Sequence, residues 1–490
     1  MKRKRSMLKS ALLSLLPVLL CQQISIGQAV VKDTIPLQHG AHRIGKRTDS
    51  AMARWRGYGL GQFIHWGLYA IPGGQWNGKE YNGAAEWIRS WNGIPNSTYD
   101  SLIYQFNPTK FDAAGWARTA KQMGARYVTI TTKHHDGFCL WPSKFTNYTV
   151  ASSPYKKDII GPLVDAYNKE GIDVILYFSV MDWHHPGWRY SIKTPEDSIA
   201  FEGFKQFTRN QLLELLHLYP SVKGLWFDGT WDASWVKQAA FADDLEKEMR
   251  ALVPGLIIGS RFRPDDLGKR HTDSNGRLIG DYEQGWERKL PKQIEDVHGN
   301  DWDCVMTIPP NQWGYKANWS NQYIKTPYDL TGMLMQAVSL GGNLVINFGP
   351  KGDGSIRKEE QDIAKALGSW LAVNKEAVYN VEYAGLPKPD YGYFTRKGNL
   401  LYLTVFNRSV NNIIRVPVPK NYGLHPQSAR LLLNKQNLPL VTSDPGMDKD
   451  ANLYYDITLP KTLVTDVPFV IEMTLEKNTG TSKKREDAKT

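Results

Sequence analysis

The stretch SVKGLWFDG, residues 221–229, decides the fold. A run of apolar and aromatic residues ends abruptly on an acid, Asp228, which a glycine follows. In a parallel β/α barrel, a buried strand presents the residue at its carboxyl end on the catalytic face. Asp228 therefore has two interpretations. It is either a nucleophile at the mouth of a barrel or a surface acid that caps the following helix, a position that Asp favours.

Segments on both sides of this strand repeat its pattern. Continuously apolar runs alternate with amphipathic helical segments about every 40 to 50 residues, as expected when both faces of a sheet are buried. The predicted strands are residues 59–67, 127–132, 172–179, 221–229, 256–260, 303–308 and 343–348, and the predicted helices are 113–124, 158–171, 202–218, 235–252, 327–340 and 358–373. The alternation predicts a (β/α)8-like, TIM-type barrel within residues 30–377. The polar stretch 267–300 is predicted to be a long active-site loop.

The pattern changes at about residue 378, where helical periodicity stops. Short β-prone runs separated by Pro, Gly and Asn follow at residues 399–406, 413–418, 429–433, 453–459 and 469–475. They predict an antiparallel β-sandwich over residues 378–476. The polar residues 477–490 are expected to be disordered.

The N-terminus has the layout of a secretory signal peptide. Five Lys and Arg residues precede the apolar run 11–20, and small residues follow near position 29. We therefore expect residues 1–29 to be removed and the chain to be exported to the periplasm or the extracellular space. A lipid anchor at Cys21 is less favoured, because the leucine before it is a poor fit to such sites. No later stretch reaches the roughly 18 apolar residues of a membrane span.

Composition limits the other classes of function. The chain has 490 residues, of which 41% are hydrophobic and 22% charged, as in a packed globular protein. Loss of residues 1–29 lowers the formal net charge from +11 to +6, and the remaining excess is spread out, which argues against nucleic acid as a partner. Cys139 and Cys304 are too few for a disulfide framework or a four-cysteine zinc site, so we expect buried thiols.

Polar and aromatic side chains collect where the predicted strands end. If the barrel forms, one mouth contains His65, His134, His135, Tyr177, Asp182, Trp226, Asp228, Arg261 and Glu287. Carboxylates and imidazoles bind hydroxyl groups, and aromatic rings offer apolar faces to the C–H groups of a sugar. The set, in a chain with 17 tryptophans, favours a carbohydrate site.

The tripeptide His134-His135-Asp136 also raises the question of a metal. Adjacent residues of a strand point to opposite faces, so both histidines would not easily reach one ion. We therefore favour hydroxyl recognition and expect no metal, with packed structural histidines as a further alternative. For Glu86 and Trp87, in a loop-rich segment, the residues alone leave a solvated acid and a functional one equally open.

A retaining glycosidase needs two carboxyl groups, one to attack the anomeric carbon and one to protonate the leaving group. Asp228, at a rigid strand end, fits the first role. Glu283 or Glu287, on the predicted loop, fits the second, since a neighbouring Trp286 would help to raise the pKa of a general acid.

The motifs together resemble those of one family, the α-L-fucosidases of glycoside hydrolase family 29. The matching stretches are QFIHWGLYAIPGGQW (62–76), AAEWI (84–88), YVTITTKHHDGFCLWPS (127–143), SVMDWHHP (179–186), LWFDG (225–229) and GGNLVINFGP (341–350). The resemblance covers nearly all of the chain after residue 29. It implies a barrel followed by a β-sandwich, and retaining hydrolysis of terminal α-L-fucosyl groups from a glycan or oligosaccharide without a cofactor.

The resemblance also implies roles for individual residues. Asp228 becomes the nucleophile, and the sugar contacts are His65, Glu86, Trp87, His134, His135, Tyr177, Trp226 and Arg261. For the acid/base we choose Glu287 over Glu283, because a proline follows it four residues later, as in similar family members. Asp303 stands where the family commonly has Glu, so no role is assigned to it. The loops at 69–76 and 84–88 look like those of the relaxed-specificity branch.

Two other functions stay open at this point. The histidine pair suggests a metal-dependent barrel hydrolase, and an intact site without turnover would make a non-catalytic fucose-binding protein. The natural glycan, its linkage, the oligomeric state and the role of the β-sandwich are not determined by the sequence.

Overall fold

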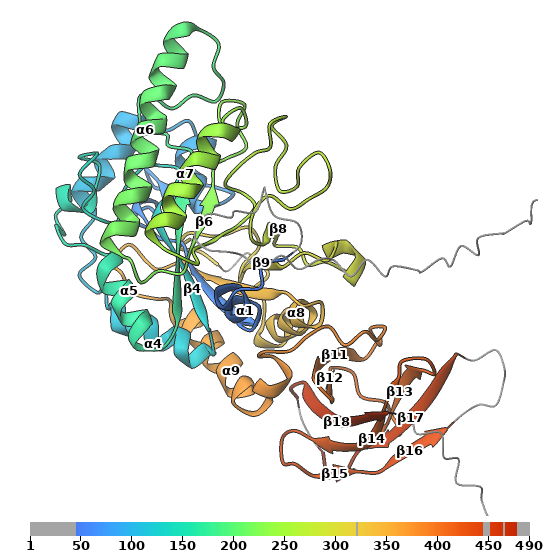
Figure 1. Ribbon diagram of the computed structural model, residues 1–490. Coiled ribbons are helices and arrows are strands. Elements are labelled where there is room, and N and C mark those ends of the chain that lie inside the picture. Colours follow the sequence, from blue (N-terminus) through green and yellow to red (C-terminus); the bar gives the residue numbers. More distant parts are fainter. Residues whose placement is uncertain (1–45, 320–321, 444–450, 464–465, 478–490) are drawn as a thin grey trace, which may run out of the picture.

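Eight parallel strands form the central sheet of the protein, in the order β7-β6-β5-β4-β1-β10-β9-β8 (Figure 1). The computed structural model describes residues 46–319, 322–443, 451–463 and 466–477, so the predicted signal peptide, Cys21 and residues 478–490 lie outside the described residues. The strands are β1 (Leu60–Ile64), β4 (Tyr127–Lys133), β5 (Asp173–Ser179), β6 (Gly224–Asp228), β7 (Ile257–Ile258), β8 (Glu283–Glu287), β9 (Trp302–Thr307) and β10 (Asn343–Phe348).

The two edges of this sheet meet, which closes its curve. The Asp281 amide donates to the Ile258 carbonyl at 2.8 Å, and the Ser260 amide donates to the Tyr282 carbonyl at 3.0 Å. These bonds join the segment before β8 to the end of β7. The predicted barrel is confirmed.

Helices cover the outside of the sheet, as the alternating pattern predicted (Figure 1). They are α4 (Ala113–Met123), α5 (Ile160–Lys169), α6 (Pro195–Leu218), α7 (Ala239–Leu252), α8 (Pro327–Ser339) and α9 (Lys358–Asn374), and α1 (Ser50–Arg56) precedes β1. Capping boxes at Thr194 and Thr326, each followed by proline, fix the starts of α6 and α8. The connections from β1 to α4 contain β2 (Gln75–Trp76), β3 (Lys79–Glu80), α2 (Ile88–Trp91) and α3 (Asn96–Tyr99).

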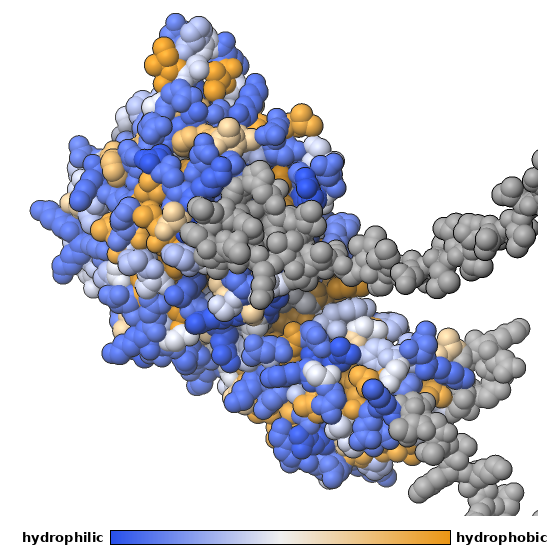
Figure 2. Space-filling view, in the orientation of Figure 1, coloured by the Kyte–Doolittle hydropathy of each residue, from blue (hydrophilic) through white to orange (hydrophobic). Residues whose placement is uncertain are grey.

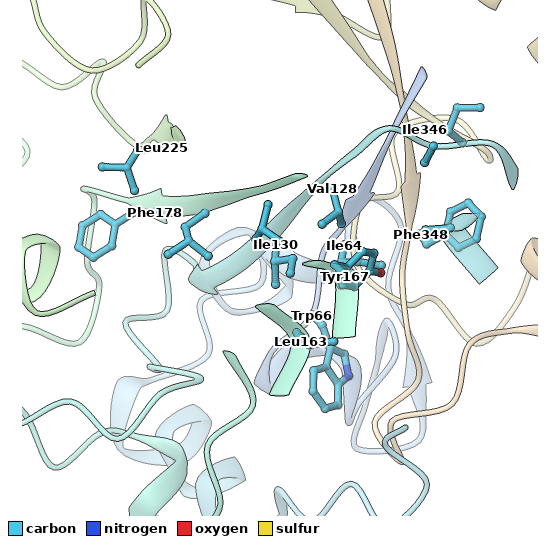
Figure 3. Close-up of a cluster of buried hydrophobic side chains, with 14 of the residues drawn as sticks. Ile64, Trp66, Val128, Ile130, Leu163, Tyr167, Phe178, Leu225, Ile346 and Phe348 are labelled. Atoms are coloured by element: carbon cyan, nitrogen blue, oxygen red, sulfur yellow. The ribbon is translucent and has the colours of Figure 1, made fainter. Parts of the chain in front are cut away.

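Both faces of the strands are buried, for two different reasons. Alternate residues such as Ile64 and Val128 face the helices, where they pack with Leu163 and Tyr167 of α5 (Figure 3). The residues that alternate with these along each strand face the barrel interior. Phe63 of β1 is one of them, and it belongs to a separate apolar cluster. This double burial explains the continuous apolar runs.

The region 267–300 differs from the prediction of a continuous loop, because it contains β8. The sequence EQGWE has only one large apolar side chain and therefore lacks the pattern of a buried strand. Its strand geometry comes from parallel pairing with β9, in which Glu287 lies beside Val305. Glu287 consequently ends a strand, as Asp228 does.

The C-terminal part consists of antiparallel sheets, as predicted. A five-stranded sheet has the order β11-β12-β18-β14-β15, and a three-stranded sheet has the order β13-β17-β16. The strands are β11 (Gly392–Lys397), β12 (Leu400–Val405), β13 (Ile413–Pro419), β14 (Leu424–Leu431), β15 (Asn437–Leu438), β16 (Leu440–Ser443), β17 (Asn452–Thr458) and β18 (Phe469–Lys477). The indole of Trp370 in α9 donates to the Pro468 carbonyl at 2.7 Å and links this part to the barrel.

Hydrophilic residues predominate on the face shown in Figure 2, with apolar residues in small groups. In the described part of the chain, no helix has the length and apolar character needed to cross a membrane. Cys139 and Cys304 are free and buried, as predicted.

Candidate active site

A pocket of about 390 Å³ opens at the carboxyl ends of the barrel strands. Asp228 is the last residue of β6 and Glu287 the last of β8, and the segments that leave β1 and β4 supply histidines. The pocket is lined by Phe63, His65, Ala84, Glu86, Trp87, Trp91, His134, His135, Trp226, Asp228, Trp231, Arg261, Arg270, His271, Glu287, Arg288, Asn311 and Trp313.

Asp228 does not cap a helix, so that alternative is wrong. The next long helix, α7, begins at Ala239, and its N-cap is Gln238. Instead, Gly229 turns the chain away at once with a φ of +65°, and a Cβ at this position would lie 2.5 Å from the Met181 Cβ. The tight turn leaves the Asp228 carboxylate at the pocket.

One arginine bridges the two carboxylates of the pocket. Arg261 Nη1 lies 3.3 Å from Asp228 Oδ1, and Nη2 lies 2.6 Å from Glu287 Oε2. Its Nε donates to the Gln284 carbonyl at 2.9 Å, which fixes the plane of the guanidinium. Burial disfavours the charge, but Asp228 and Glu287 outweigh it and raise the pKa of Arg261. Asp228 Oδ2 accepts a further hydrogen bond from the Tyr177 hydroxyl at 3.0 Å.

The two glutamates of β8 have different surroundings. Glu287 lines the pocket. Glu283 does not: its carboxyl group lies beside Asn300 and Trp286, where burial raises its pKa. The geometry therefore brings only Glu287 to the bridging guanidinium of Arg261.

The hydrogen bonds of His135 define its neutral tautomer. Ser179 Oγ donates its only hydrogen to the Met181 carbonyl at 2.6 Å, so it must accept from His135 Nδ1 at 2.7 Å. Burial lowers the pKa of His135 to about 4, although Asp228 acts in the opposite direction. The Nε2 atom therefore bears a lone pair, and it lies 3.7 Å from Asp228 Oδ2.

His65 is held in the same way. Asn347 Nδ2 donates to the Trp313 carbonyl at 2.7 Å, which turns Asn347 Oδ1 toward His65 Nδ1 at 2.6 Å. Burial lowers the pKa of His65 to about 3, so the neutral ring carries its proton on Nδ1. Both imidazoles thus offer Nε2 as a hydrogen-bond acceptor, which suits hydroxyl groups.

His134 and His135 both line the pocket, so the argument that they face opposite ways is wrong. The strand ends at Lys133, and the histidines belong to the turn that follows. His134 stacks on Tyr177 with ring centroids 5.6 Å apart, and burial lowers its pKa. Within the described residues, no group of three or more His, Cys, Asp or Glu side chains could hold a metal ion.

Glu86 is a buried acid, which excludes the alternative of a solvated one. It lies in a short 3-10 helix, residues Ala85–Trp87, and is only 1% exposed. Its Oε2 accepts from the Gly314 amide at 2.9 Å, whereas Oε1 has no partner among the described residues. Burial raises the pKa of Glu86 to about 7. Near neutral pH this carboxyl group can donate or accept a hydrogen bond from a ligand.

Tryptophans supply the apolar walls. Trp226 is buried between the Arg261 guanidinium, 4.8 Å from its ring centroid, and Tyr177. Trp87 packs edge-on against His135 at 4.9 Å. A ligand in this pocket therefore meets carboxylates, imidazoles and indole faces together, the combination expected for a sugar.

Comparison with known proteins agrees with this geometry. A family model described as alpha-L-fucosidase matches residues 39–376. The chain belongs to the α-L-fucosidase family. Tissue alpha-L-fucosidase from Macaca fascicularis is 28% identical over 377 residues, which cover 74% of this chain and 76% of that protein. Plasma alpha-L-fucosidase from Homo sapiens is 29% identical over 368 residues, which cover 71% of this chain and 74% of that protein.

Solved fucosidase structures are more similar still. A family 29 alpha-L-fucosidase from Bacteroides thetaiotaomicron is 52% identical, with a TM-score of 0.85 and coverage of 90% of this chain and 98% of that one. A second structure from that organism, at 52% identity and a TM-score of 0.85, covers 90% of this chain and 100% of that one and is a trapped covalent intermediate. It was obtained with 2-fluoro-fucosyl fluoride and a variant in which glutamine replaces a glutamate.

Most of the residues predicted for a fucosidase site lie together. Those that line the pocket are His65, Glu86, Trp87, His134, His135, Trp226, Asp228, Arg261 and Glu287. Tyr177 does not line the pocket, but its hydroxyl donates to Asp228, which does. Asp182 was wrongly expected at the mouth. It is buried in an ion pair with Lys133 at 3.0 Å and accepts from the backbone amides of His184 and His185.

The sequence did not indicate several members of the fucosidase pocket. Trp231 follows Asp228 by three residues, and its nearness to LWFDG was a signal that could have found it. Others come from the long connections after β7, β8 and β9 and carry no recognisable motif. They are Arg270, His271, Arg288, Asn311 and Trp313.

Proposed function

We propose that the chain is an exported, retaining exo-α-L-fucosidase that removes terminal α-L-fucosyl groups from glycans or oligosaccharides. The observation that carries the proposal is the Arg261 bridge between Asp228 and Glu287. A retaining glycosidase needs two carboxyl groups on either side of the scissile bond, and one guanidinium holds this pair at a single pocket.

In the first step, Asp228 attacks the anomeric carbon and the glycosidic C–O bond breaks. Glu287 gives its proton to the departing oxygen, so the aglycone leaves as an alcohol and a fucosyl ester of Asp228 remains. In the second step, Glu287 takes a proton from water, the resulting nucleophile attacks the same carbon, and the Asp228 carboxylate departs. The trapped covalent intermediate of the Bacteroides thetaiotaomicron relative supports this sequence.

The remaining side chains would bind the sugar. His65 and His135 accept from hydroxyl donors through Nε2, and Glu86 supplies a carboxyl group that can act as a donor or an acceptor. Trp226 and Trp87 provide apolar faces. All these contacts come from the protein, so the proposal requires no cofactor.

The test is the release of 4-nitrophenol from 4-nitrophenyl α-L-fucoside. Asp228→Ala should abolish release, and the parent enzyme should gain the mass of one fluorofucosyl group after reaction with 2-fluoro-fucosyl fluoride. For the acid/base, azide should rescue Glu287→Ala but not Glu283→Ala. Full activity of Asp228→Ala would refute the nucleophile assignment, and azide rescue of Glu283→Ala alone would transfer the acid/base role.

Two further parts of the proposal have separate tests. Cell fractionation and N-terminal sequencing of the isolated protein should show export and loss of the first 29 residues. A panel of fucosyl oligosaccharides with defined linkages should reveal relaxed specificity, with hydrolysis of more than the branched α-1,3/1,4 linkages.

A further inference from the structure

The mouth of the pocket contains aromatic surface that the fucosyl site does not use. Trp91 and Trp231 are 52% and 39% exposed, whereas the deeper His65 and Trp226 are almost fully buried. Both exposed rings lie nearly parallel to Trp87, at centroid distances of 5.6 and 6.4 Å. Exposed indoles at the entrance of a sugar pocket offer a face to a second ring outside the first.

Arg270 lies at the same mouth and has unused donors. One terminal nitrogen donates to Thr230 Oγ1 at 3.0 Å, but the buried Nε has no partner among the described residues. The acids whose charges act on it are Asp228 and Asp232, and no ion pair to Arg270 occurs in the described part of the chain. Burial and the charge of Arg261 lower the pKa of Arg270 to about 10. The Arg270 side chain is half-buried, and its buried, unmet Nε donor is costly unless a hydrogen-bond acceptor satisfies it.

The other groups at the mouth do not cancel this positive charge. Arg288 is 40% exposed, contacts Asn311, and lies 3.4 Å from Glu287, whose other oxygen binds Arg261. His271 Nδ1 lies 2.9 Å from the Ser260 hydroxyl, and burial with the two neighbouring arginines lowers the pKa of His271 to about 4. The mouth therefore has two arginines, and the carboxylates beside them are already engaged or lie out of contact.

We propose that this mouth is an aglycone subsite for an acidic sugar, one that bears a sulfate ester or a carboxylate. The exposed faces of Trp91 and Trp231 contact the sugar ring, and Arg270 donates hydrogen bonds to the anionic group. The inference rests on the proposed function, because the subsite adjoins the fucosyl group that Asp228 and Glu287 process.

Transfer of the fucosyl group tests the subsite without assuming a linkage. A hydroxyl of an acceptor sugar attacks the anomeric carbon of the fucosyl-enzyme, Glu287 takes its proton, and the Asp228 carboxylate departs. The donor is 4-nitrophenyl α-L-fucoside, and the acceptors are methyl β-D-galactoside, its 6-sulfate and methyl β-D-galacturonide. We expect half-maximal transfer at concentrations at least about tenfold lower for the charged acceptors, because Arg270 would donate hydrogen bonds to their anionic group.

Arg270→Gln should reduce that difference to nearly onefold. Arg277→Gln is the matched control, because Arg277 lies on the same connection, pairs with Asp273 at 2.9 Å and does not line the pocket. It should preserve the difference. High salt should reduce the preference in the parent enzyme.

The outcomes separate the two proposals. Absence of 4-nitrophenol release would refute the proposed function. Release with equal use of all three acceptors, or with no transfer to any of them, would overturn the subsite alone, as would equal losses in Arg270→Gln and Arg277→Gln. If only the sulfate or only the uronide is preferred, that acceptor identifies the anion.

Discussion

Removal of the Ser179 hydroxyl should change the chemistry of His135 while leaving every residue that lines the pocket in place. In the parent protein, Ser179 accepts from His135 Nδ1, and Nε2 is free to accept from a ligand. In Ser179→Ala, the Nδ1–H group would be buried without a partner. We expect the proton to move to Nε2, where it points at Asp228 Oδ2, 3.7 Å away.

The size of the effect follows from this loss of an acceptor. An unsatisfied buried donor costs about 1–3 kcal/mol, which is enough to reverse the choice between two tautomers of similar energy. A sugar hydroxyl that donated to Nε2 would then meet a second donor and lose a similar amount. The expected loss in kcat/KM is about tenfold to hundredfold.

Two measurements check the reasoning. Kinetics with 4-nitrophenyl α-L-fucoside give kcat/KM, and nitrogen-15 NMR of labelled histidine identifies the protonated ring nitrogen of His135. Ser153→Ala is a matched control, since Ser153 is also buried and donates to the Val150 carbonyl at 2.7 Å, but it does not line the pocket. Parent-like kcat/KM in Ser179→Ala, or an Nε2–H tautomer already present in the parent, would refute the mechanism.

Three other perturbations have defined outcomes. Asn347→Asp places a carboxylate against His65 Nδ1 and should raise the pKa of His65 from about 3. Activity should then fall at acidic pH, because the protonated ring carries a hydrogen on Nε2 and can no longer accept there. An unchanged acidic limb of the pH–rate profile would contradict this. Arg261→Lys replaces a planar fork by a point charge that cannot bridge two carboxylates in the same way, and kcat should fall at least about tenfold while the unfolding temperature changes little. Burial raises the pKa of Asp303 to about 8, above the value of about 3.9 in the unfolded chain. The folded protein therefore gains stability from the bound proton. This gain is complete below about pH 4 and is lost as the pH rises through 8. Asp303→Asn should therefore show a smaller fall in unfolding temperature between pH 5 and pH 9 than the parent; equal falls would show that Asp303 does not titrate in this range.

The sequence predicted the barrel because most of its strands are buried on both faces and therefore read as continuous apolar runs. The strand that was missed, β8, has the sequence EQGWE and is specified by its pairing with β9 rather than by its own side chains. The error at His134 and His135 has a different cause. Both lie beyond the predicted strand 127–132 and beyond β4, which ends at Lys133, so the alternation of side chains along a strand does not apply to them.

Glu86 and Trp87 were predicted through the motif AAEWI, but the other predicted residues that line the pocket lie within three positions of a strand end. There the fold alone fixes the position of the side chain, as for His65 after β1 and Asp228 in β6. Arg270 lies far from the end of β7 in the chain, and tertiary contacts bring it to the pocket. Sequence reasoning has no rule for such contacts.

The difference between groups at strand ends and groups in the connections affects which fucosides the enzyme prefers. Most groups that the proposed mechanism uses on the fucosyl ring are placed by strand ends and held by buried hydrogen bonds from the barrel itself, such as those of Ser179 and Asn347. The exceptions are Glu86 and Trp87, which a short 3-10 helix places. The groups of the proposed aglycone subsite, Trp91, Trp231 and Arg270, all lie outside the strands. Substitutions in the loops can therefore alter the preferred aglycone without moving the reacting carboxylates, whereas substitutions that loosen a strand end should affect every fucoside alike. Comparing the loss for Arg270→Gln across acceptors with the loss for Ser179→Ala measures this separation directly: the first should depend on acceptor charge, and the second should not.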